Sequence, residues 1–404
     1  MVKFLIGVNY WPRKKAMYWW KEFEEDEVRS EFKKIRDLSV DIIRFFLLWE
    51  DFQPTPWKVN KETLIKLETV LNIADKYRLK TIPTLFVGHM SGVNWAPKWL
   101  LDKSSSSVYP VISGGKVTPY GVKDIYRDQD VLKAEIFLIK TIVSAFKEHP
   151  AIYAWDISNE IDNLKIPDSP QIAKNWCNVI FSEIKRLDPQ HPVTLGLHQE
   201  NLEFDKGFHI QDLPFDLVSM HGYSILAPWA EDPLDSDVVP FLNVLTEHLA
   251  GKPVIFQEFG IPTAPSGSPE RILNKVLIFK KEVTLVLASE DEAATYYKEV
   301  LEKLYLVGSL GAVAWCFSDY DPSIWNRFPL DKNVIERFMG IVRSDGNLKY
   351  AGKVLHEFAL QRKKVVSCPI KLNILRENYY NNPLKNLKEA FKEFKKKIRE
   401  ITFI

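Results

Sequence analysis

Eight short, nearly continuous apolar segments recur along the chain, and longer segments with helical periodicity separate them. A strand that is buried on both faces of a parallel sheet reads as such an apolar run, without polar alternation. The eight predicted strands are Lys3–Val8, Asp41–Leu48, Lys80–Val87, Ala151–Ile157, Val193–Leu197, Asp216–His221, Pro253–Glu258 and Gly311–Phe317.

The segments between these strands carry apolar residues every three or four positions, as amphipathic helices do. The predicted helices are Asp26–Leu38, Leu64–Tyr77, Val131–Phe146, Ile172–Leu187 and Ala293–Leu306. Alternating strands and helices predict an α/β fold, a (β/α)8 TIM barrel with a short C-terminal helical extension. A doubly wound open sheet is the alternative, but no GxGxxG motif follows the first strand.

Two long polar segments follow predicted strands. Asp102–Lys123 is rich in Ser, Gly and Pro and follows the third strand, and Thr263–Pro269 follows the seventh. Barrel enzymes build their sites from such loops at the carboxyl ends of the strands. We expect both loops to cover a substrate.

The pattern changes near residue 363, so we expect a barrel over residues 1–363 and an extension over 364–404. Apolar residues recur at helical spacing in the extension, namely Leu384, Leu387, Phe391, Phe394, Ile398 and Ile401. An apolar stripe of this width is typical of a helix docked on the outside of a domain. A membrane-surface or oligomer contact is the alternative, and the oligomeric state stays open.

Composition narrows the class of protein. The formal net charge is +1, so no global field attracts nucleic acid. Cys177, Cys316 and Cys368 stand singly, without the spacing of a metal site, and we expect neither a metal nor another cofactor. No apolar stretch is long enough to span a membrane, and no signal peptide is recognisable, so we expect a cytoplasmic protein. Abundant Lys and Glu suggest a heat-adapted source.

Two glutamates end apolar strands in hydrophobic surroundings. Glu160 follows the fourth strand and Glu258 ends the seventh. A carboxylate among apolar residues loses hydration, which raises its pKa unless partners compensate. Strands four and seven lie across a barrel mouth from each other, so the two carboxyls can flank one bond. Glycoside hydrolysis requires such a pair.

Several further residues fall at strand ends in a recognisable order. They are Arg44 on the second strand, His89 after the third, Asn159-Glu160 after the fourth, His221-Gly222-Tyr223 after the sixth, Glu258 on the seventh and Trp315 on the eighth. The chain resembles the (β/α)8 retaining glycosidases, and among them glycoside hydrolase family 5, over residues 1 to about 360. Single matches are weak, but the complete ordered series is specific.

The resemblance implies a role for each residue. Glu160 would be the general acid/base and Glu258 the nucleophile. Asn159 would bind the sugar 2-hydroxyl, and Tyr223 and Arg44 would keep Glu258 ionised.

The remaining aromatic and imidazole groups would contact the sugar. The resemblance makes Trp315 the floor under the reacting ring, and His89 and His221 would bind hydroxyls or carboxylates. Taken singly, each histidine would more often be a structural one. Aromatic rings stack on sugar faces, and among the twelve tryptophans we expect Trp95 and Trp325 to be further sugar platforms.

The segments WEDFQPTP, TLFVGHMSGVNW and HGYSILAPW resemble the endo-β-mannanase and β-mannosidase branch of the family. The resemblance therefore implies a retaining hydrolase of β-1,4-linked mannose-containing oligo- or polysaccharides. A β-glucanase or cellulase, and an exo-acting β-mannosidase or other β-glycosidase, are the alternatives. A carbohydrate-binding barrel without activity ranks low because both glutamates are present, and an aldolase or lyase lacks a strand-end lysine.

Overall fold

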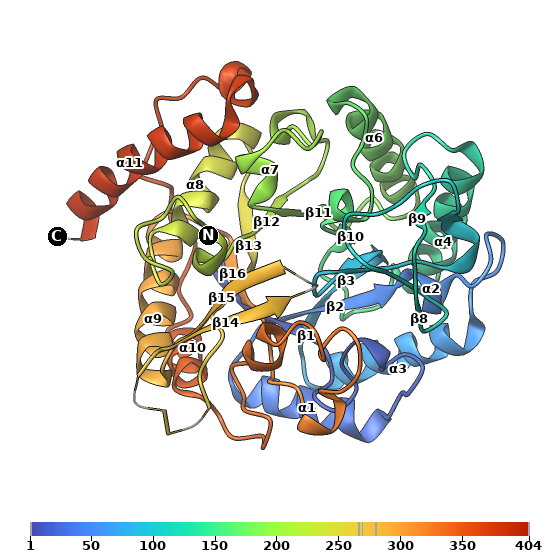
Figure 1. The fold of residues 1–404 in the computed structure, drawn as a ribbon, viewed down its shortest axis with the longest axis horizontal. Helices are drawn as coiled ribbons and strands as arrows, with labels where there is room; N and C mark the ends of the chain where they lie inside the picture. Colours follow the sequence, from blue (N-terminus) through green and yellow to red (C-terminus); the bar gives the residue numbers. More distant parts are fainter. Residues whose placement is uncertain (1, 266, 269, 279–280, 403–404) are drawn as a thin grey trace.

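The computed structural model describes residues 2–265, 267–268, 270–278 and 281–402, and it contains a closed barrel of eight parallel strands (Figure 1). Each strand pairs with the next one along the chain, and the eighth strand pairs with the first. The barrel strands are β1 (Leu5–Tyr10), β2 (Ile42–Leu48), β3 (Lys80–Val87), β10 (Trp155–Asn159), β11 (Val193–His198), β12 (Val218–His221), β13 (Val254–Phe259) and β16 (Gly311–Ala314). The predicted (β/α)8 fold is confirmed.

Long helices surround the barrel (Figure 1). They are α1 (Glu25–Asp37), α3 (Lys61–Lys76), α4 (Gln129–Phe146), α6 (Pro170–Leu187), α8 (Val238–Ala250), α9 (Glu290–Leu306) and α10 (Tyr350–Leu360). The sequence analysis did not identify α8 and α10. Most residues of α8 are buried, so this helix lacks the polar face on which helical periodicity depends.

Shorter helices occupy the connections. The one-turn α-helices are α2 (Trp49–Phe52), α5 (Ile161–Leu164) and α7 (Glu200–Glu203). The 3-10 helices are Ala16–Tyr18, Lys98–Leu100, Ile210–Asp212, Ser224–Leu226, Pro322–Ile324, Ile335–Phe338 and Arg376–Asn381.

The connection after β3 forms small sheets. Its strands are β4 (His89–Met90), β5 (Val93–Trp95), β6 (Leu101–Asp102), β7 (Val111–Ser113), β8 (Lys116–Thr118) and β9 (Gly121–Val122). The predicted loop Asp102–Lys123 therefore contains three of these strands and part of β6. Very short strands give little periodic signal, which explains why the sequence reads as a loop.

The connection after β13 contains an antiparallel hairpin that the sequence analysis did not predict. Its strands are β14 (Ile272–Ile278) and β15 (Lys281–Leu287). In the predicted loop Thr263–Pro269, residues 266 and 269 lie outside the described residues.

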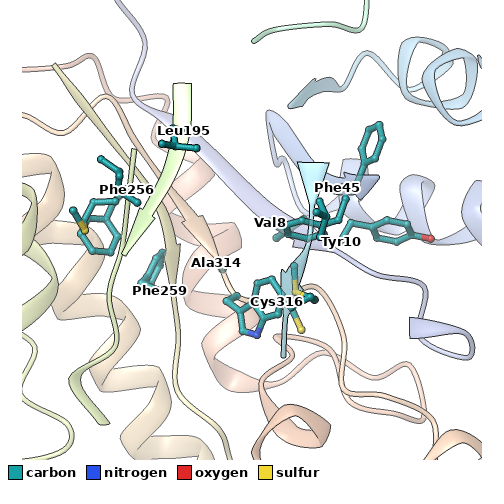
Figure 2. Packing of buried hydrophobic residues seen from close by; sticks show 14 of the residues in the cluster. Val8, Tyr10, Phe45, Leu195, Phe256, Phe259, Ala314 and Cys316 are labelled. Carbon is teal, nitrogen blue, oxygen red and sulfur yellow. The ribbon is translucent and has the colours of Figure 1, made fainter. Parts of the chain in front are cut away.

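The inside of the barrel is apolar toward the amino-terminal ends of the strands and polar toward their carboxyl ends. Successive side chains of a strand point to opposite faces, so residues two apart share the interior. Ile42, Ile82 and Ile255 belong to one buried apolar cluster, and two positions further along the same strands stand Arg44, Thr84 and Gln257. The outward-facing residues pack into the main core, part of which Figure 2 shows around Val8, Phe45, Phe256 and Ala314.

The C-terminal helix α11 (Pro383–Thr402) lies against α8 on the outside of the barrel (Figure 1). Phe391 makes ring contacts with Trp229 and Phe241, and Phe394 also contacts Phe241. The apolar stripe of α11 is therefore covered by the barrel's own helices. None of the helices in the described part of the chain could span a lipid bilayer.

Candidate active site

Irregularities in two barrel strands bring the paired glutamates to the mouth. The register of β13 against its neighbours shifts near residues 256–259, so Gln257 and Glu258 both reach interior partners although they are adjacent. The register of β10 against β11 shifts between Asp156 and Asn159. Such bulges re-aim side chains next to active sites. The alternating strand pattern alone would place one residue of each adjacent pair outside.

Donors surround the carboxylate of Glu258. The Tyr223 hydroxyl donates to Oε2 over 2.7 Å, and Arg44 Nη1 donates to Oε1. His221 Nδ1 lies 3.4 Å from the same Oε1. Glu258 is 4% exposed, so these groups replace most of the water that an ionised carboxyl needs. The arrangement presents Glu258 as a carboxylate held in one position.

The Arg44 guanidinium is fully buried and organises four residues. Nε donates to Asp156 Oδ2 over 2.9 Å, Nη1 donates to Asn9 Oδ1 over 3.1 Å, and Nη2 donates to Asn159 Oδ1 over 2.9 Å. Asp156 also accepts from Thr84, from the Gly196 amide and, over 3.5 Å, from Gln257 Nε2. The sequence analysis missed Asp156, although a charged residue within an apolar strand was a signal that could have identified it.

Glu160 directly precedes α5 and has an unusual backbone conformation. Its φ is 45°, in the left-handed region that residues with a Cβ rarely adopt. Oε1 lies 3.0 Å from His221 Nδ1, and Oε2 accepts from Asn163 Nδ2 over 3.0 Å. Burial by itself raises the pKa of Glu160, but His198 and His221 outweigh burial and hold this pKa well below its usual range.

His198 is a further site residue that the sequence analysis missed. Its Nδ1 lies 3.9 Å from Glu160 Oε2, and its Nε2 lies 2.9 Å from Asp162 Oδ2. Burial by itself lowers the pKa of His198, but the charges of Asp162 and Glu160 raise it to about 9. At neutral pH a positive charge therefore lies beside Glu160. His198 ends the fifth barrel strand, and this position is the only signal the sequence offered.

The two glutamates share one imidazole. One oxygen of Glu160, one oxygen of Glu258 and a ring nitrogen of His221 lie within 4.8 Å of one another. Among the described residues, these three side chains could also coordinate a metal ion. Arg44 and Tyr223 already donate to both oxygens of Glu258, so we interpret the group as two carboxyls that share one imidazole.

Trp315 directly follows β16. Its ring meets Phe46 edge to face at 5.7 Å between centroids, and its indole N–H donates to Glu336 Oε2 over 3.3 Å. Glu336 belongs to the short 3-10 helix Ile335–Phe338 and was not among the predicted site residues. Glu336 lies more than twenty residues beyond the last barrel strand, and no sequence motif marks this position.

His89 is placed at the edge of the site. Its Nδ1 lies 2.7 Å from Asn94 Oδ1, and its carbonyl accepts from Asn159 Nδ2 over 3.1 Å. Burial lowers the pKa of His89, which favours the neutral ring. Asn159 thus connects the backbone of His89 with the Arg44 network.

The two predicted sugar platforms are packed against other side chains in the structure. Trp95 is 1% exposed and meets the Tyr18 ring edge to face at 5.7 Å, which makes it a packing residue in place of an open platform. Trp325 is half-buried, and the guanidinium of Arg337 lies 5.2 Å from its ring centroid. Aromatic content alone did not separate packing rings from open ones.

No family model matches the chain. Among curated proteins, it is 25% identical over 255 residues to a probable mannan endo-1,4-β-mannosidase A-1 of Aspergillus terreus, covering 57% of this chain and 58% of that protein. It is 26% identical over 219 residues to mannan endo-1,4-β-mannosidase F of Aspergillus clavatus, covering 49% of this chain and 44% of that protein. The chain thus spans about half the length of the curated relatives it matches.

Solved structures share the fold. An exo-β-1,4-mannosidase from an Opitutaceae bacterium has a TM-score of 0.72 at 24% identity, covering 89% of this chain and 59% of that one. A GH5_18 protein from Streptomyces cattleya has a TM-score of 0.78 at 18% identity, covering 97% and 90%. Together with the mannanase relatives, these similarities confirm the resemblance to glycoside hydrolase family 5.

Proposed function

We propose, from this resemblance and from the paired glutamates, that the protein is a retaining glycoside hydrolase. It cleaves β-1,4-linked mannose-containing oligo- or polysaccharides by double displacement. Glu258 is the nucleophile and Glu160 the general acid/base.

The observation that carries the proposal is the spacing of the two carboxyls. Oxygens of Glu160 and Glu258 lie within 4.8 Å of each other. Retaining enzymes hold their carboxyl groups roughly 5–5.5 Å apart, whereas inverting enzymes need room for a water between them. The different partners of the two groups support different tasks. Glu258 contacts a cation and a hydroxyl donor, and Glu160 contacts an imidazole and an amide.

In the first step, Glu258 Oε attacks the anomeric carbon while the bond to the leaving oxygen breaks. Protonated Glu160 gives its proton to that oxygen, and a covalent glycosyl-enzyme remains. Arg44 and Tyr223 orient Glu258 for the attack. His221 Nδ1 lies within hydrogen-bond distance of the Glu160 carboxyl and can accept from it when Glu160 is protonated.

In the second step, Glu160 acts as a carboxylate. It takes a proton from a water molecule, whose oxygen attacks the anomeric carbon, and Glu258 leaves as a carboxylate. His198 favours the ionised form of Glu160 that this step requires. Asn159 is positioned by Arg44 and by the His89 carbonyl, consistent with a contact to the 2-hydroxyl.

The names of the curated relatives support mannan as the substrate class. The Streptomyces cattleya structure with Manβ1-4GlcNAc shows that a protein of the same fold, with a TM-score of 0.77, holds a β-mannoside. A hydrolysis panel of manno-, gluco-, xylo- and galacto-oligosaccharides tests this choice. We expect cleavage of the manno-series, and faster cleavage of the gluco-series would make a β-glucanase the better assignment.

Substitution of the two glutamates tests the mechanism. We expect Glu258→Gly to lose more than about 1000-fold in kcat, with partial rescue by azide, because a small anion can replace the nucleophile. We expect Glu160→Ala to lose turnover of oligosaccharides but to retain cleavage of 2,4-dinitrophenyl glycosides, which need little protonation. Initial rates measure both effects.

Glu357→Gln is a matched control, because Glu357 is exposed on α10. This variant should keep the wild-type rate. If both glutamate variants cleaved an oligosaccharide at the normal rate, the proposal would be wrong.

A further inference from the structure

A one-turn helix beside the site carries a side chain that holds the partners of Glu160. Helix α7 begins two residues after His198 and contains Asn201, which is 1% exposed. Asn201 Oδ1 accepts from the backbone N–H of His198 over 3.0 Å, and Asn201 Nδ2 donates to Asp162 Oδ2 over 3.1 Å. The imidazole of His198 contacts that same oxygen of Asp162. Asn201 therefore fixes both members of the ion pair that lies beside Glu160.

The position of α7 depends on contacts from elsewhere in the chain. A helix of four residues is not stable by itself, because its nucleation fixes several residues for few hydrogen bonds. Its last carbonyls also have no partner within the helix. The Leu202 carbonyl accepts from the hydroxyl of Tyr379 over 2.7 Å, and the Asn201 carbonyl lies 3.1 Å from the hydroxyl of Tyr380. These phenols lie 177 and 179 residues further along the chain.

Both tyrosines are firmly held themselves. Tyr379 is fully buried. The hydroxyl of Tyr380 accepts from the Ile210 amide over 3.3 Å and lies 3.3 Å from the Phe208 carbonyl. Its ring stacks on His209, with 4.0 Å between the centroids and 9° between the planes. Tyr380 thus contacts the connection after β11 at α7 and again several residues beyond it.

The two tyrosines belong to a segment that we call the C-terminal arm, residues 376–402. It consists of the 3-10 helix Arg376–Asn381 and α11. Asn386 Nδ2 on α11 donates to the Tyr379 carbonyl over 2.7 Å, which joins the two parts. Helix α11 lies against α7 and α8 (Figure 1), and Phe391 packs on α8. Apolar packing explains why the arm docks on the barrel, but it does not require two hydroxyls that bind the carbonyls of α7.

Several charges act on the ion pair that Asn201 fixes. The charged and titratable groups around His198 include Asp162, Glu160, Lys206, Glu203 and His89. Asp162 Oδ2 lies 2.9 Å from Nε2 of His198, and Glu160 Oε2 lies 3.9 Å from Nδ1. Both distances change if α7 moves, because Asn201 contacts His198 and Asp162.

We propose that the C-terminal arm positions the acid/base of the enzyme. The hydroxyls of Tyr379 and Tyr380 hold α7, and Asn201 on α7 holds His198 beside Glu160. The three residues are positioning residues, because they act through His198. This inference rests on the proposed glycosidase function and specifies how its general acid/base is kept in place. Loss of one of these contacts lets His198 move away from its two carboxylates, so the pKa of Glu160 rises and that of His198 falls.

The alkaline limb of the kcat/KM pH profile tests the positioning, because this limb follows the pKa of Glu160. We expect Tyr379→Phe and Tyr380→Phe to move the limb upward by roughly 0.3–1 pH unit on an unactivated mannoside, a part of the shift that complete loss of an opposite charge produces. In a His198→Gln background the same substitutions should move it no further, because the charge that they position is absent. An unchanged limb in the folded single variants, or an equal shift in both backgrounds, would overturn the inference.

The titration of the His198 imidazole provides a second test that needs no substrate. NMR of the protein with 15N-labelled histidine follows it, and His198→Gln identifies the signals of this residue among the eight histidines. We expect the pKa of His198 to be roughly 0.3–1 unit lower in Tyr380→Phe and in Asn201→Ala than in the wild type. If the tyrosine variants do not fold, Asn201→Ala still decides. The wild-type pKa of His198 in these variants would contradict the positioning role.

Tyr350→Phe is the matched control, because Tyr350 is exposed at the start of α10. It removes a phenol hydroxyl as well and should leave both the alkaline limb and the His198 titration unchanged. If the wild type cleaves no oligosaccharide of the panel, the proposed function is wrong. The His198 titration then still decides whether the C-terminal arm holds the ion pair.

Discussion

At the scale of single residues, the imidazole of His198 governs how readily Glu160 holds a proton. Asp162 keeps His198 positively charged, and this charge lies 3.9 Å from Glu160 Oε2. A general acid usually has a raised pKa, whereas His198 and His221 lower that of Glu160. The protonated form needed for the first step is therefore populated under acidic conditions, and the carboxylate needed for the second step is favoured at neutral pH.

We predict that His198→Gln moves the alkaline limb of the kcat/KM pH profile upward. The free enzyme must have Glu160 protonated, so this limb follows the pKa of Glu160. Removal of an opposite charge at this distance raises a carboxyl pKa by roughly 1–3 units. Rates on an unactivated mannoside between pH 3 and 9 measure the shift.

The control is His149→Gln, because His149 lies at the end of α4 and contacts Asn72 and its own loop. This variant should leave the profile unchanged. An alkaline limb that stays in place in His198→Gln would show that the imidazolium does not act on Glu160.

At the scale of elements, close packing between strands decides whether the polar side chains of the site fit inside the barrel. Gly196 lies on β11, beside β10 and β12. A Cβ at this position would stand 2.7 Å from the Ser158 carbonyl oxygen, 3.0 Å from Arg44 Nη2 and 3.1 Å from His221 Cε1. The absence of a side chain at residue 196 therefore leaves room for two site residues at once.

We predict that Gly196→Ala lowers kcat/KM by roughly 100-fold, because displacement of a site residue by about 1 Å has an effect of this size. Overpacking should also destabilise the fold by about 1–3 kcal/mol. Steady-state kinetics and urea unfolding measure the two effects. In Gly115→Ala, the new Cβ would have no neighbour within 4 Å, although φ is positive there. We expect that variant to keep full activity, and an active Gly196→Ala enzyme would contradict the prediction.

At the scale of the whole molecule, several carboxyls are buried in a way that favours their neutral form. Burial raises the pKa of Glu31 to about 8, and it raises the pKa values of Asp51 and Asp319 to about 6. Their unfolded values are about 4.3 for Glu and about 3.9 for Asp. The folded state thus binds more protons than the unfolded state between these limits. The stability gained is complete below the unfolded values and is lost as pH rises through the folded ones.

We predict that the free energy of unfolding falls as the pH rises from 5 to 9. Glu31 contributes on the order of 3–5 kcal/mol to this decrease, since each pKa unit corresponds to about 1.4 kcal/mol. The folded state lowers the pKa values of Glu160 and Asp162, so these two groups act in the opposite direction. Their contribution to stability is lost only at acid pH, below this window. Chemical denaturation at each pH measures the slope.

Glu31→Gln should flatten that slope, because an amide does not titrate. Glu357→Gln should keep it, because Glu357 is exposed. A Glu31→Gln protein with the wild-type pH dependence would show that Glu31 is not the titrating group.

The amino-acid sequence by itself determined the strands, their order and the strand ends that carry Glu160 and Glu258. Apolar runs and helical periodicity are local properties, and a chain of alternating strands and helices closes into a barrel by general packing rules. The sugar-platform roles of Trp95 and Trp325 stay predictions, because composition does not tell whether a ring face is open, and Trp95 is 1% exposed.

Only the tertiary structure decided which side chains meet. Register shifts in β10 and β13 turn adjacent residues toward one interior, and no local pattern encodes them. Asp156, His198 and Glu336 reach the site from positions that carry no motif, because their role depends on distances across the barrel mouth. Electrostatic and hydrogen-bond interactions act over a few ångströms in space, whereas the sequence records only neighbours along the chain.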